Sequence, residues 1–225
     1  MINRLPRWVL YGSALLAFSA GFINCVALLG FANMAVSHVT GTVTLTAAAL
    51  IKGDWSRLGL GLWIVLAFFV GSIISGMIIR NEALRLGRRY SLALVLESLL
   101  LFAATGCFFY QSIWGELLAS AACGLQNAMI ATYSGSVIRT THLTGIVSDL
   151  GAGIGNYLSG QGFDAKQFQL QSSIFLAFFI GSGVGAVFYL WIAYWALLIP
   201  AVLVLIAAAA YWWVMVFHVL LDESK

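Results

Sequence analysis

Apolar runs of about 18 residues or more recur along the whole chain, separated by short polar stretches. Runs of that length are typical of helices that cross a lipid bilayer. We expect six spans, over residues 8–30, 58–80, 90–110, 113–133, 168–191 and 195–217. Residues 31–52 and 134–160 are too polar for lipid-facing spans. We interpret these two segments as re-entrant broken helices, which enter the membrane and return on the same side.

The second half of the chain repeats the plan of the first half. A polar pentapeptide reads Ser-His-Val-Thr-Gly at positions 37–41 and Thr-His-Leu-Thr-Gly at positions 141–145. Residues 21–24 match 124–127, and residues 66–72 match 176–182, in the same order along the chain. Apolar composition alone does not produce ordered matches that include polar residues. We therefore divide the chain into two repeats, residues 1–111 and 112–225.

The distribution of Lys and Arg indicates how the repeats lie, because cytoplasmic loops of membrane proteins carry the excess of positive residues. With six spans and a cytoplasmic N-terminus, nine of these residues lie inside and two, Lys52 and Arg57, lie outside. With eight full spans the division is six to five. The pattern predicts an all-α polytopic membrane protein with two inverted repeats of three transmembrane helices, each with a re-entrant broken helix. Both termini are then cytoplasmic.

Composition excludes several classes of protein. The chain is 62% hydrophobic and 8% charged, whereas a soluble domain carries about 25% charged residues. The net charge of +3 is small and scattered, so we expect no nucleic-acid partner. The three cysteines lie apart within apolar segments, which argues against a disulfide framework or a metal site. No Ser-His-Asp, Cys-His or phosphate-loop pattern stands out, and we expect no enzyme activity, no cofactor and no metal.

A short helix is expected to begin after the Thr-Gly pair of each pentapeptide. The free N–H groups and positive dipole end of a helix start favour an anion or a polar oxygen. Broken helices of inverted repeats meet near the membrane midplane in transporters, so we expect the two turns to share one polar site. The candidate substrate-binding residues of this site are Asn24, His38, Thr40, Gly41, Thr42, Gln126, Asn127, His142, Thr144, Gly145 and Ser148.

Structural roles compete with solute binding for these residues. The histidines can brace the turns, the hydroxyl groups can cap helices, and the amide side chains can form hydrogen bonds between helices. Gly41 and Gly145 fit positions where the backbone closely approaches a ligand or a neighbouring helix.

Two acidic residues are candidates for proton coupling, because a carboxylate inside a membrane is costly and marks a functional site. We expect Asp149 to line the shared site, although it can instead neutralise Arg139 near the interface. Glu97 lies within an expected span and can instead form a hydrogen bond to a neighbouring helix.

The function that this pattern favours is a small secondary transporter or permease that works by alternating access on a small polar solute, with anions among the candidates. The alternative is a membrane binding or sensor protein that uses the same site without transport. A membrane enzyme would need a catalytic arrangement, and the sequence indicates none. The expected partners are membrane lipid, the solute and a second copy of the chain, which would pack against glycine-rich faces at 71–76 and 181–185.

Three motifs resemble those of the YoaK-type family of small bacterial membrane proteins, a domain of unknown function. Gly21 with Asn24 and residues 31–42 look like the first motif, residues 124–127 like the second, and residues 140–145 like the third. Asn24 stands where the family usually has an aspartate, and Thr42 where an asparagine usually follows Thr-Gly. The resemblance covers nearly the whole chain, supports the expected fold and implies a bacterial inner (plasma) membrane location.

Overall fold

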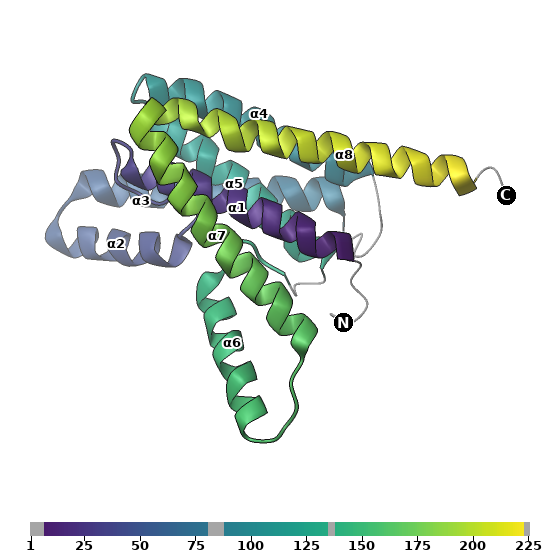
Figure 1. Ribbon diagram of the computed structural model, residues 1–225. Helices are drawn as coiled ribbons and strands as arrows, with labels where there is room; N and C mark the ends of the chain where they lie inside the picture. Colours follow the sequence, from purple (N-terminus) through teal and green to yellow (C-terminus); the bar gives the residue numbers. More distant parts are fainter. Residues whose placement is uncertain (1–6, 81–87, 135–137, 223–225) are drawn as a thin grey trace.

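The computed structural model describes residues 7–80, 88–134 and 138–222. Within them every regular element is helical, which confirms the expected all-α class. The arginine-rich stretch 81–87 and residues 135–137 of the second expected re-entrant segment lie outside the described residues. The elements in chain order are α1 (Arg7–Leu29), α2 (Val39–Lys52), α3 (Trp55–Ile79), α4 (Arg88–Phe109), α5 (Ile113–Tyr133), α6 (Leu143–Leu158), α7 (Ala165–Ile192), the 3-10 helix η2 (Ala193–Leu197) and α8 (Leu198–Asp222) (Figure 1).

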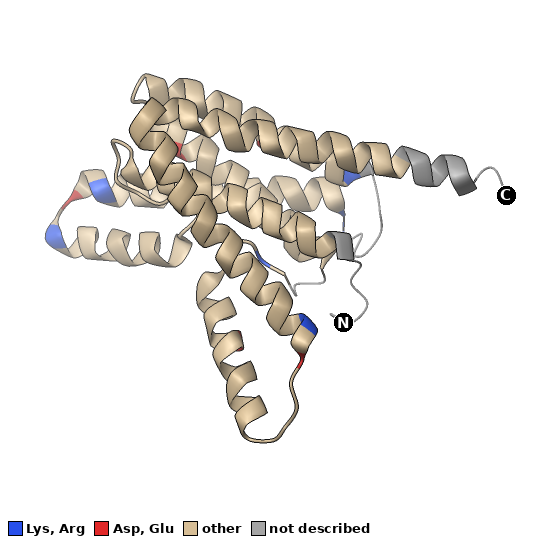
Figure 2. Cartoon of the chain, in the orientation of Figure 1, with Lys and Arg blue, Asp and Glu red and all other residues tan. Residues whose placement is uncertain are grey.

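Long apolar helices dominate the structure. Within the described ranges, the stretches long and apolar enough to cross a membrane are Val9–Leu29, Trp55–Ile79, Arg89–Phe109 and Ala165–Met215. The last stretch contains both α7 and α8, and the chain turns between them at Ala193, whose φ of 51° ends the helix. Charged side chains are few and lie mostly near helix ends, as at the α2–α3 turn and the start of α7 (Figure 2). These helices fit a multi-pass membrane protein, as the composition predicts.

Helix α5 is the polar helix of the interior, and it packs against both α3 and α4. Its Ser120 hydroxyl is buried and lies 3.0 Å from the carbonyl oxygen of Val36 and 2.9 Å from that of Ile64. Its Gln126 donates from Nε2 to the carbonyl oxygen of Leu16 in α1, at 2.6 Å. Such bonds join helices where no water is present to satisfy their carbonyl groups. They explain how a helix with polar side chains can be buried in the bundle.

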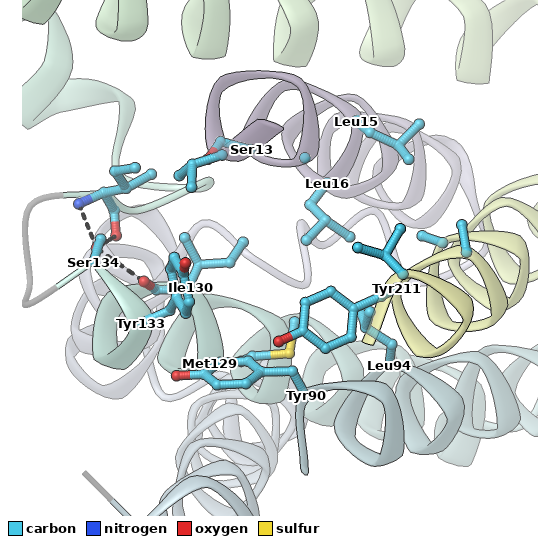
Figure 3. A pocket seen from close by; sticks show the side chains of 16 residues that line it. Ser13, Leu15, Leu16, Tyr90, Leu94, Met129, Ile130, Tyr133, Ser134 and Tyr211 are labelled. Atoms are coloured by element: carbon cyan, nitrogen blue, oxygen red, sulfur yellow. Dashed lines mark hydrogen bonds between the residues drawn. The ribbon is translucent and has the colours of Figure 1, made fainter. Parts of the chain in front are cut away.

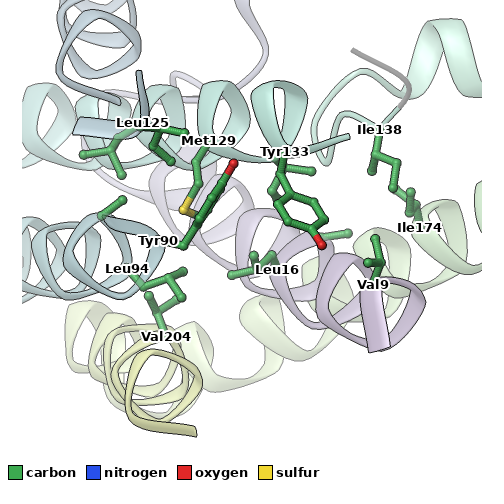
Figure 4. Close-up of a cluster of buried hydrophobic side chains, with 14 of the residues drawn as sticks. Val9, Leu16, Tyr90, Leu94, Leu125, Met129, Tyr133, Ile138, Ile174 and Val204 are labelled. Atoms are coloured by element: carbon green, nitrogen blue, oxygen red, sulfur yellow. The ribbon is translucent and has the colours of Figure 1, made fainter. Parts of the chain in front are cut away.

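Two clusters of buried apolar side chains lie at opposite ends of the bundle and reveal the directions of the helices. One cluster joins the starts of α1 and α4 to the end of α5, through Val9, Tyr90 and Tyr133 (Figure 4). The other joins the end of α1 to the start of α5, through Val26 and Ala119. The remaining members of the two clusters give the directions of the other helices in the same way. Helices α1, α4 and α7 run in one direction, and α3, α5 and α8 run in the opposite direction (Figure 1).

The closest helix packing crosses between the two halves of the chain. Helix α7 packs on α1 and α3 packs on α5, through glycines that leave no room for a side chain. A Cβ atom at Gly71 would lie 2.7 Å from the carbonyl carbon of Ala121, and one at Gly181 would lie 2.8 Å from that of Phe18. These glycines belong to the faces that we expected to pack against a second copy. Gly71 and Gly181 are used inside the chain, whereas a Cβ atom at Gly76 or Gly183 of the same faces would have no neighbour within 4 Å, and the homodimer stays a prediction.

Hydroxyl groups reinforce both crossings at equivalent positions. Ser72 in α3 donates to the carbonyl oxygen of Gly124 at 3.1 Å, and Ser182 in α7 donates to that of Gly21 at 3.2 Å. Gly21 corresponds to Gly124 in the match of residues 21–24 with 124–127. Ser72 corresponds to Ser182 in the match of residues 66–72 with 176–182. The two halves therefore use the same residues for the same contacts.

The short helices α2 and α6 lie outside this bundle, each against the helix that follows it (Figure 1). Helix α2 ends at Gly53, at a φ of 70°, and α3 begins at once because the Asp54 side chain accepts from the backbone N–H of Arg57 at 3.0 Å. Thr46 of α2 fills the space over Gly61 of α3, so these two helices pack closely. Helix α6 contacts α7 less extensively and leaves a cleft beside it.

Candidate functional site

Each pentapeptide forms the start of a short helix, in the same conformation. His38 stands immediately before α2 with φ −90° and ψ 63°, and His142 stands before α6 with φ −93° and ψ 59°. Neither histidine side chain caps its helix. The first helical hydrogen bonds are donated by Thr42 and Ile146, so the three amides before each have no acceptor within the helix. Both helices therefore begin with uncapped N–H groups, but they begin at Val39 and Leu143, before the Thr-Gly pair and not after it as we expected.

The glycine of each pentapeptide makes room for the histidine three residues earlier. A Cβ atom at Gly145 would lie 2.6 Å from Nδ1 of His142, and one at Gly41 would overlap the ring of His38. We expected these glycines to admit a ligand or a neighbouring helix. The structure corrects this explanation: each glycine lets the imidazole of its own turn lie against the helix start.

The two pentapeptides, which are about a hundred residues apart in the sequence, line one cavity of about 490 Å³. This cavity, which we call the shared cavity, lies beside the middle of α3 and α7, where Phe68 and Phe178 contribute to its wall. The lining residues come largely in pairs from the two repeats, namely Asn24 with Asn127, Ser37 with Thr141, His38 with His142, Thr40 with Thr144 and Phe68 with Phe178. The structure thus places six of the predicted binding residues around one space, which are Asn24, His38, Thr40, Asn127, His142 and Thr144.

The two asparagines of the shared cavity differ in their hydrogen bonds. Oδ1 of Asn24 accepts from the backbone N–H of Ser37 at 3.0 Å and from its hydroxyl at 2.9 Å. Oδ1 of Asn127 is buried and has no hydrogen-bond partner among the described residues. Asn24 therefore braces the first turn, whereas Asn127 has an acceptor available for a solute.

The other predicted binding residues do not line the shared cavity. The Thr42 hydroxyl donates to the carbonyl oxygen of His38 at 3.0 Å, and the Ser148 hydroxyl to that of Thr144 at 3.0 Å. Each hydroxyl group bonds back to the carbonyl oxygen four residues earlier, at the start of its own helix, so it neither caps a free N–H group nor faces the cavity. Gln126 points to α1, which matches the alternative of bonding between helices. Gly41 and Gly145 lie beneath the histidine rings.

Sequence reasoning missed several residues of the shared cavity. Arg139 lines it and is exposed there, although the sequence suggested only a loop cation that contributes to the charge count. Its position two residues before the second pentapeptide was the available signal. Ser72, Phe68 and Phe178 also line it, and their place within the 66–72 and 176–182 match was a signal for them.

Neither proton-coupling candidate lies at the shared cavity. Asp149 lines a separate polar cleft of about 750 Å³ between α6 and α7, where its carboxylate accepts from Nε2 of Gln171 at 2.8 Å. The expectation that Asp149 lines the shared site is therefore wrong, because the side chain leaves α6 on the face toward α7. Glu97 in α4 is fully buried, and its oxygens have no partner among the described residues. Glu116 in α5, which the sequence analysis did not single out, has the same properties.

A third cavity, of about 400 Å³, is almost entirely apolar and lies between α1, α4, α5 and α8 (Figure 3). Tyr90, Tyr133 and Tyr211 group on one side of it, with the rings of Tyr90 and Tyr133 edge to face at 5.2 Å. No charged side chain of the described residues lines this space. The shared cavity is therefore the better site for a polar solute. Nor do three His, Cys, Asp or Glu side chains gather as a metal site anywhere in the described ranges.

Comparison with known proteins places the chain in a family. Residues 12–210 match the model of a family described as "Protein of unknown function (DUF1275)". No curated protein and no solved structure matches the chain. The match confirms the expected membership of a family of unknown function, while the YoaK-type name is a finer assignment that the match does not carry. Since the matched residues make up most of the sequence, the chain belongs to the DUF1275 family.

Proposed function

We propose that this protein is a small secondary transporter or permease that moves a small polar solute through the shared cavity. The observation that carries the proposal is that two copies of one pentapeptide, from opposite halves of the chain, begin two short helices at one cavity. The cavity lies near the middle of α3 and α7, where a membrane-spanning helix is deepest in the bilayer. Binding at the midplane between related halves is the plan that alternating access requires.

The helix directions support an inverted relation between the halves. In the first half, α1 and α4 are parallel to each other and α3 is antiparallel to them. In the second half, α7 is parallel to α1, whereas α5 and α8 are antiparallel to α1. Equivalent helices of the two repeats are thus antiparallel. Eight full spans would make α1 and α4 antiparallel, whereas six spans with α2 and α6 re-entrant make them parallel. We infer the six-span arrangement in a bacterial inner membrane, with both termini cytoplasmic as the Lys and Arg distribution predicts.

An osmotic assay tests transport while the identity of the solute is still open. Proteoliposomes are shifted into concentrated solutions of single solutes, which include polyols, amino acids, carboxylates and oxyanions, and recovery of volume is followed by light scattering. At least one solute should enter faster than it enters empty liposomes. Gly145→Leu should abolish this flux because the new side chain displaces His142. Gly155→Leu is the matched control, since a Cβ atom there has no neighbour within 4 Å.

Two results would contradict the proposal. Protein-independent entry of every solute would remove the transport function. Saturable binding of a solute that never crosses the membrane would favour the alternative, a binding or sensor protein that uses the same cavity.

A further inference from the structure

We infer that the solute of the shared cavity is a small anion, a carboxylate or an inorganic oxyanion, held between the two helix starts and the guanidinium group of Arg139. This inference rests on the proposed function and narrows it to one class of substrate. It follows from the charges at the cavity, from its hydrogen-bond donors and from its apolar wall.

The charges that line the shared cavity have one sign. Arg139 is the only Lys, Arg, Asp or Glu among the described residues that line it. The nearest acidic residue in the sequence, Asp149, is bonded to Gln171 at a different cleft. Arg139 has no salt bridge to another described residue. A bound anion would supply the counter-charge that no described side chain at the cavity provides for Arg139.

The hydrogen-bonding groups at the cavity are chiefly donors, and they are arranged for an anion. The uncapped amides at 39–41 and 143–145 begin two helices whose positive dipole ends lie at the same space. The hydroxyl groups of Thr40 and Thr144 add donors at equivalent places. Helix starts of this kind bind phosphate, sulfate and carboxylate groups in other proteins. Two converging starts together with a guanidinium group make a stronger anion site than either helix alone.

The rest of the wall limits the solute to a small molecule and strengthens its attraction to Arg139. Phe68, Phe69 and Phe178 give the cavity an apolar side. Charges interact more strongly where the surroundings have a low dielectric constant. The cavity volume of about 490 Å³ falls in the range of small-molecule sites, roughly 300–1,000 Å³. A carboxylate with a short apolar group would place that group on the phenylalanine wall.

The buried acceptor of Asn127 adds a further condition. Its Oδ1 has no partner among the described residues, and a buried acceptor without a donor is destabilising. A hydroxyl group beside the anionic group of the solute would supply the donor. A hydroxy acid such as lactate should therefore bind more tightly than propionate, which has the same carboxylate and no hydroxyl.

Thermal unfolding in lipid nanodiscs tests the charge of the solute with matched probes. The probes are lactate, propionate, sulfate and phosphate as anions, lactamide as the neutral counterpart of lactate, and ethanolammonium as a small cation, all at constant ionic strength. We expect a saturable rise in the unfolding temperature with at least one anion and none with lactamide or ethanolammonium. Arg139→Gln should weaken that binding about tenfold or more, because a hydrogen bond to a charged group is lost. Arg57→Gln, which removes an exposed cation far from the cavity lining, should not.

The outcomes separate this inference from the proposed function. Response to sulfate and phosphate alone would assign an oxyanion, and response to lactate or propionate a carboxylate. Equal stabilisation by lactamide or by the cation, or unchanged anion affinity in Arg139→Gln, would overturn the anion inference and leave the cavity as a solute site. If none of the probes binds, the anion inference fails, while solute flux in the osmotic assay decides the transport function independently.

Discussion

Replacing Gly181 by alanine should destabilise the protein, whereas the same change at Gly183, on the same helix, should not. A Cβ atom at Gly181 would lie 2.8 Å from the carbonyl carbon of Phe18 and 2.9 Å from its Cα atom, and closer still to the carbonyl oxygen. These are backbone atoms of α1, so no side-chain rotation can relieve the contact. A Cβ atom at Gly183 has no neighbour within 4 Å.

The magnitude follows from comparing the two variants. A methyl group forced into a packed interface costs about 1–3 kcal/mol, because helices must move apart to admit it. Alanine is also a better helix former than glycine by roughly 0.5–1 kcal/mol, and this gain is the same at both positions. The difference in the free energy of unfolding between Gly181→Ala and Gly183→Ala therefore isolates the packing cost, and we expect it to be about 1–3 kcal/mol.

Unfolding by sodium dodecyl sulfate in mixed micelles, followed by helical circular dichroism, measures this difference. The first repeat offers an internal replicate, because Gly71 meets Ala121 as Gly181 meets Phe18, and Gly76 is open as Gly183 is. Gly71→Ala should therefore be less stable than Gly76→Ala by a similar amount. Equal unfolding midpoints for Gly181→Ala and Gly183→Ala would refute the reasoning, because they would mean that α7 does not pack on α1 in this way.

Three further predictions concern the site and the topology. Asn24→Ala should lower the free energy of unfolding by about 1–3 kcal/mol, because the backbone N–H and the hydroxyl group of Ser37 lose their acceptor. Asn127→Ala should leave the free energy of unfolding nearly unchanged, since its Oδ1 has no partner among the described residues. Equal losses in detergent unfolding would contradict the bracing role of Asn24. If Asp149 carries a coupled proton from its separate cleft, Asp149→Asn should keep the fold and remove any pH dependence of solute flux; an unchanged pH profile would exclude the coupling role and leave Glu97 as the next candidate. In a variant without native cysteines, an impermeant maleimide should reach Trp55→Cys and Ser159→Cys from opposite sides of the membrane; labelling from the same side would contradict six spans.

The helical class and the long apolar helices could be predicted because they depend on composition and segment length alone. The sequence also indicated that a short helix begins at each pentapeptide, although the helices begin before the Thr-Gly pair and not after it. The role of the pentapeptide glycines could not be predicted. A glycine that admits a ligand and one that admits the ring of a histidine three residues earlier look the same in a sequence.

Two further features depend on how helices face one another, which periodicity does not determine in a membrane. A helix in lipid is apolar all round, so the sequence did not reveal that Gly71 and Gly181 face the other half of the chain instead of a second copy. The sequence also did not show which way Asp149 points, because only the fold brings α7 and its Gln171 beside α6. The sequence identified Arg139 only as a positive charge of a loop, which Asp149 could neutralise. The fold shows that Arg139 lines the shared cavity.

The packing across the two halves leads to a last prediction, which concerns folding of the halves on their own. Helix α7 packs on α1, α3 packs on α5, and α4 packs on both α5 and α8, so most of the helix contacts join one half to the other. Ser91 and Ser98 of α4 also donate to carbonyl oxygens of α8, at 3.2 and 2.8 Å. Residues 1–111, expressed alone, would keep few contacts besides those of α2 and α4 with α3. Each half should therefore be degraded when it is produced separately.

Co-expression of residues 1–111 and 112–225 should restore both halves, because the break falls in the short turn between α4 and α5 and removes no helix. Co-purification through a tag on one half, together with protease resistance, measures the reconstitution. Gly181→Ala in the second half should weaken it, and Gly183→Ala should not, since only the first position touches the other half. Stable, protease-resistant accumulation of residues 1–111 alone would show that the repeat buries its own core, and it would contradict a fold built on packing between the repeats.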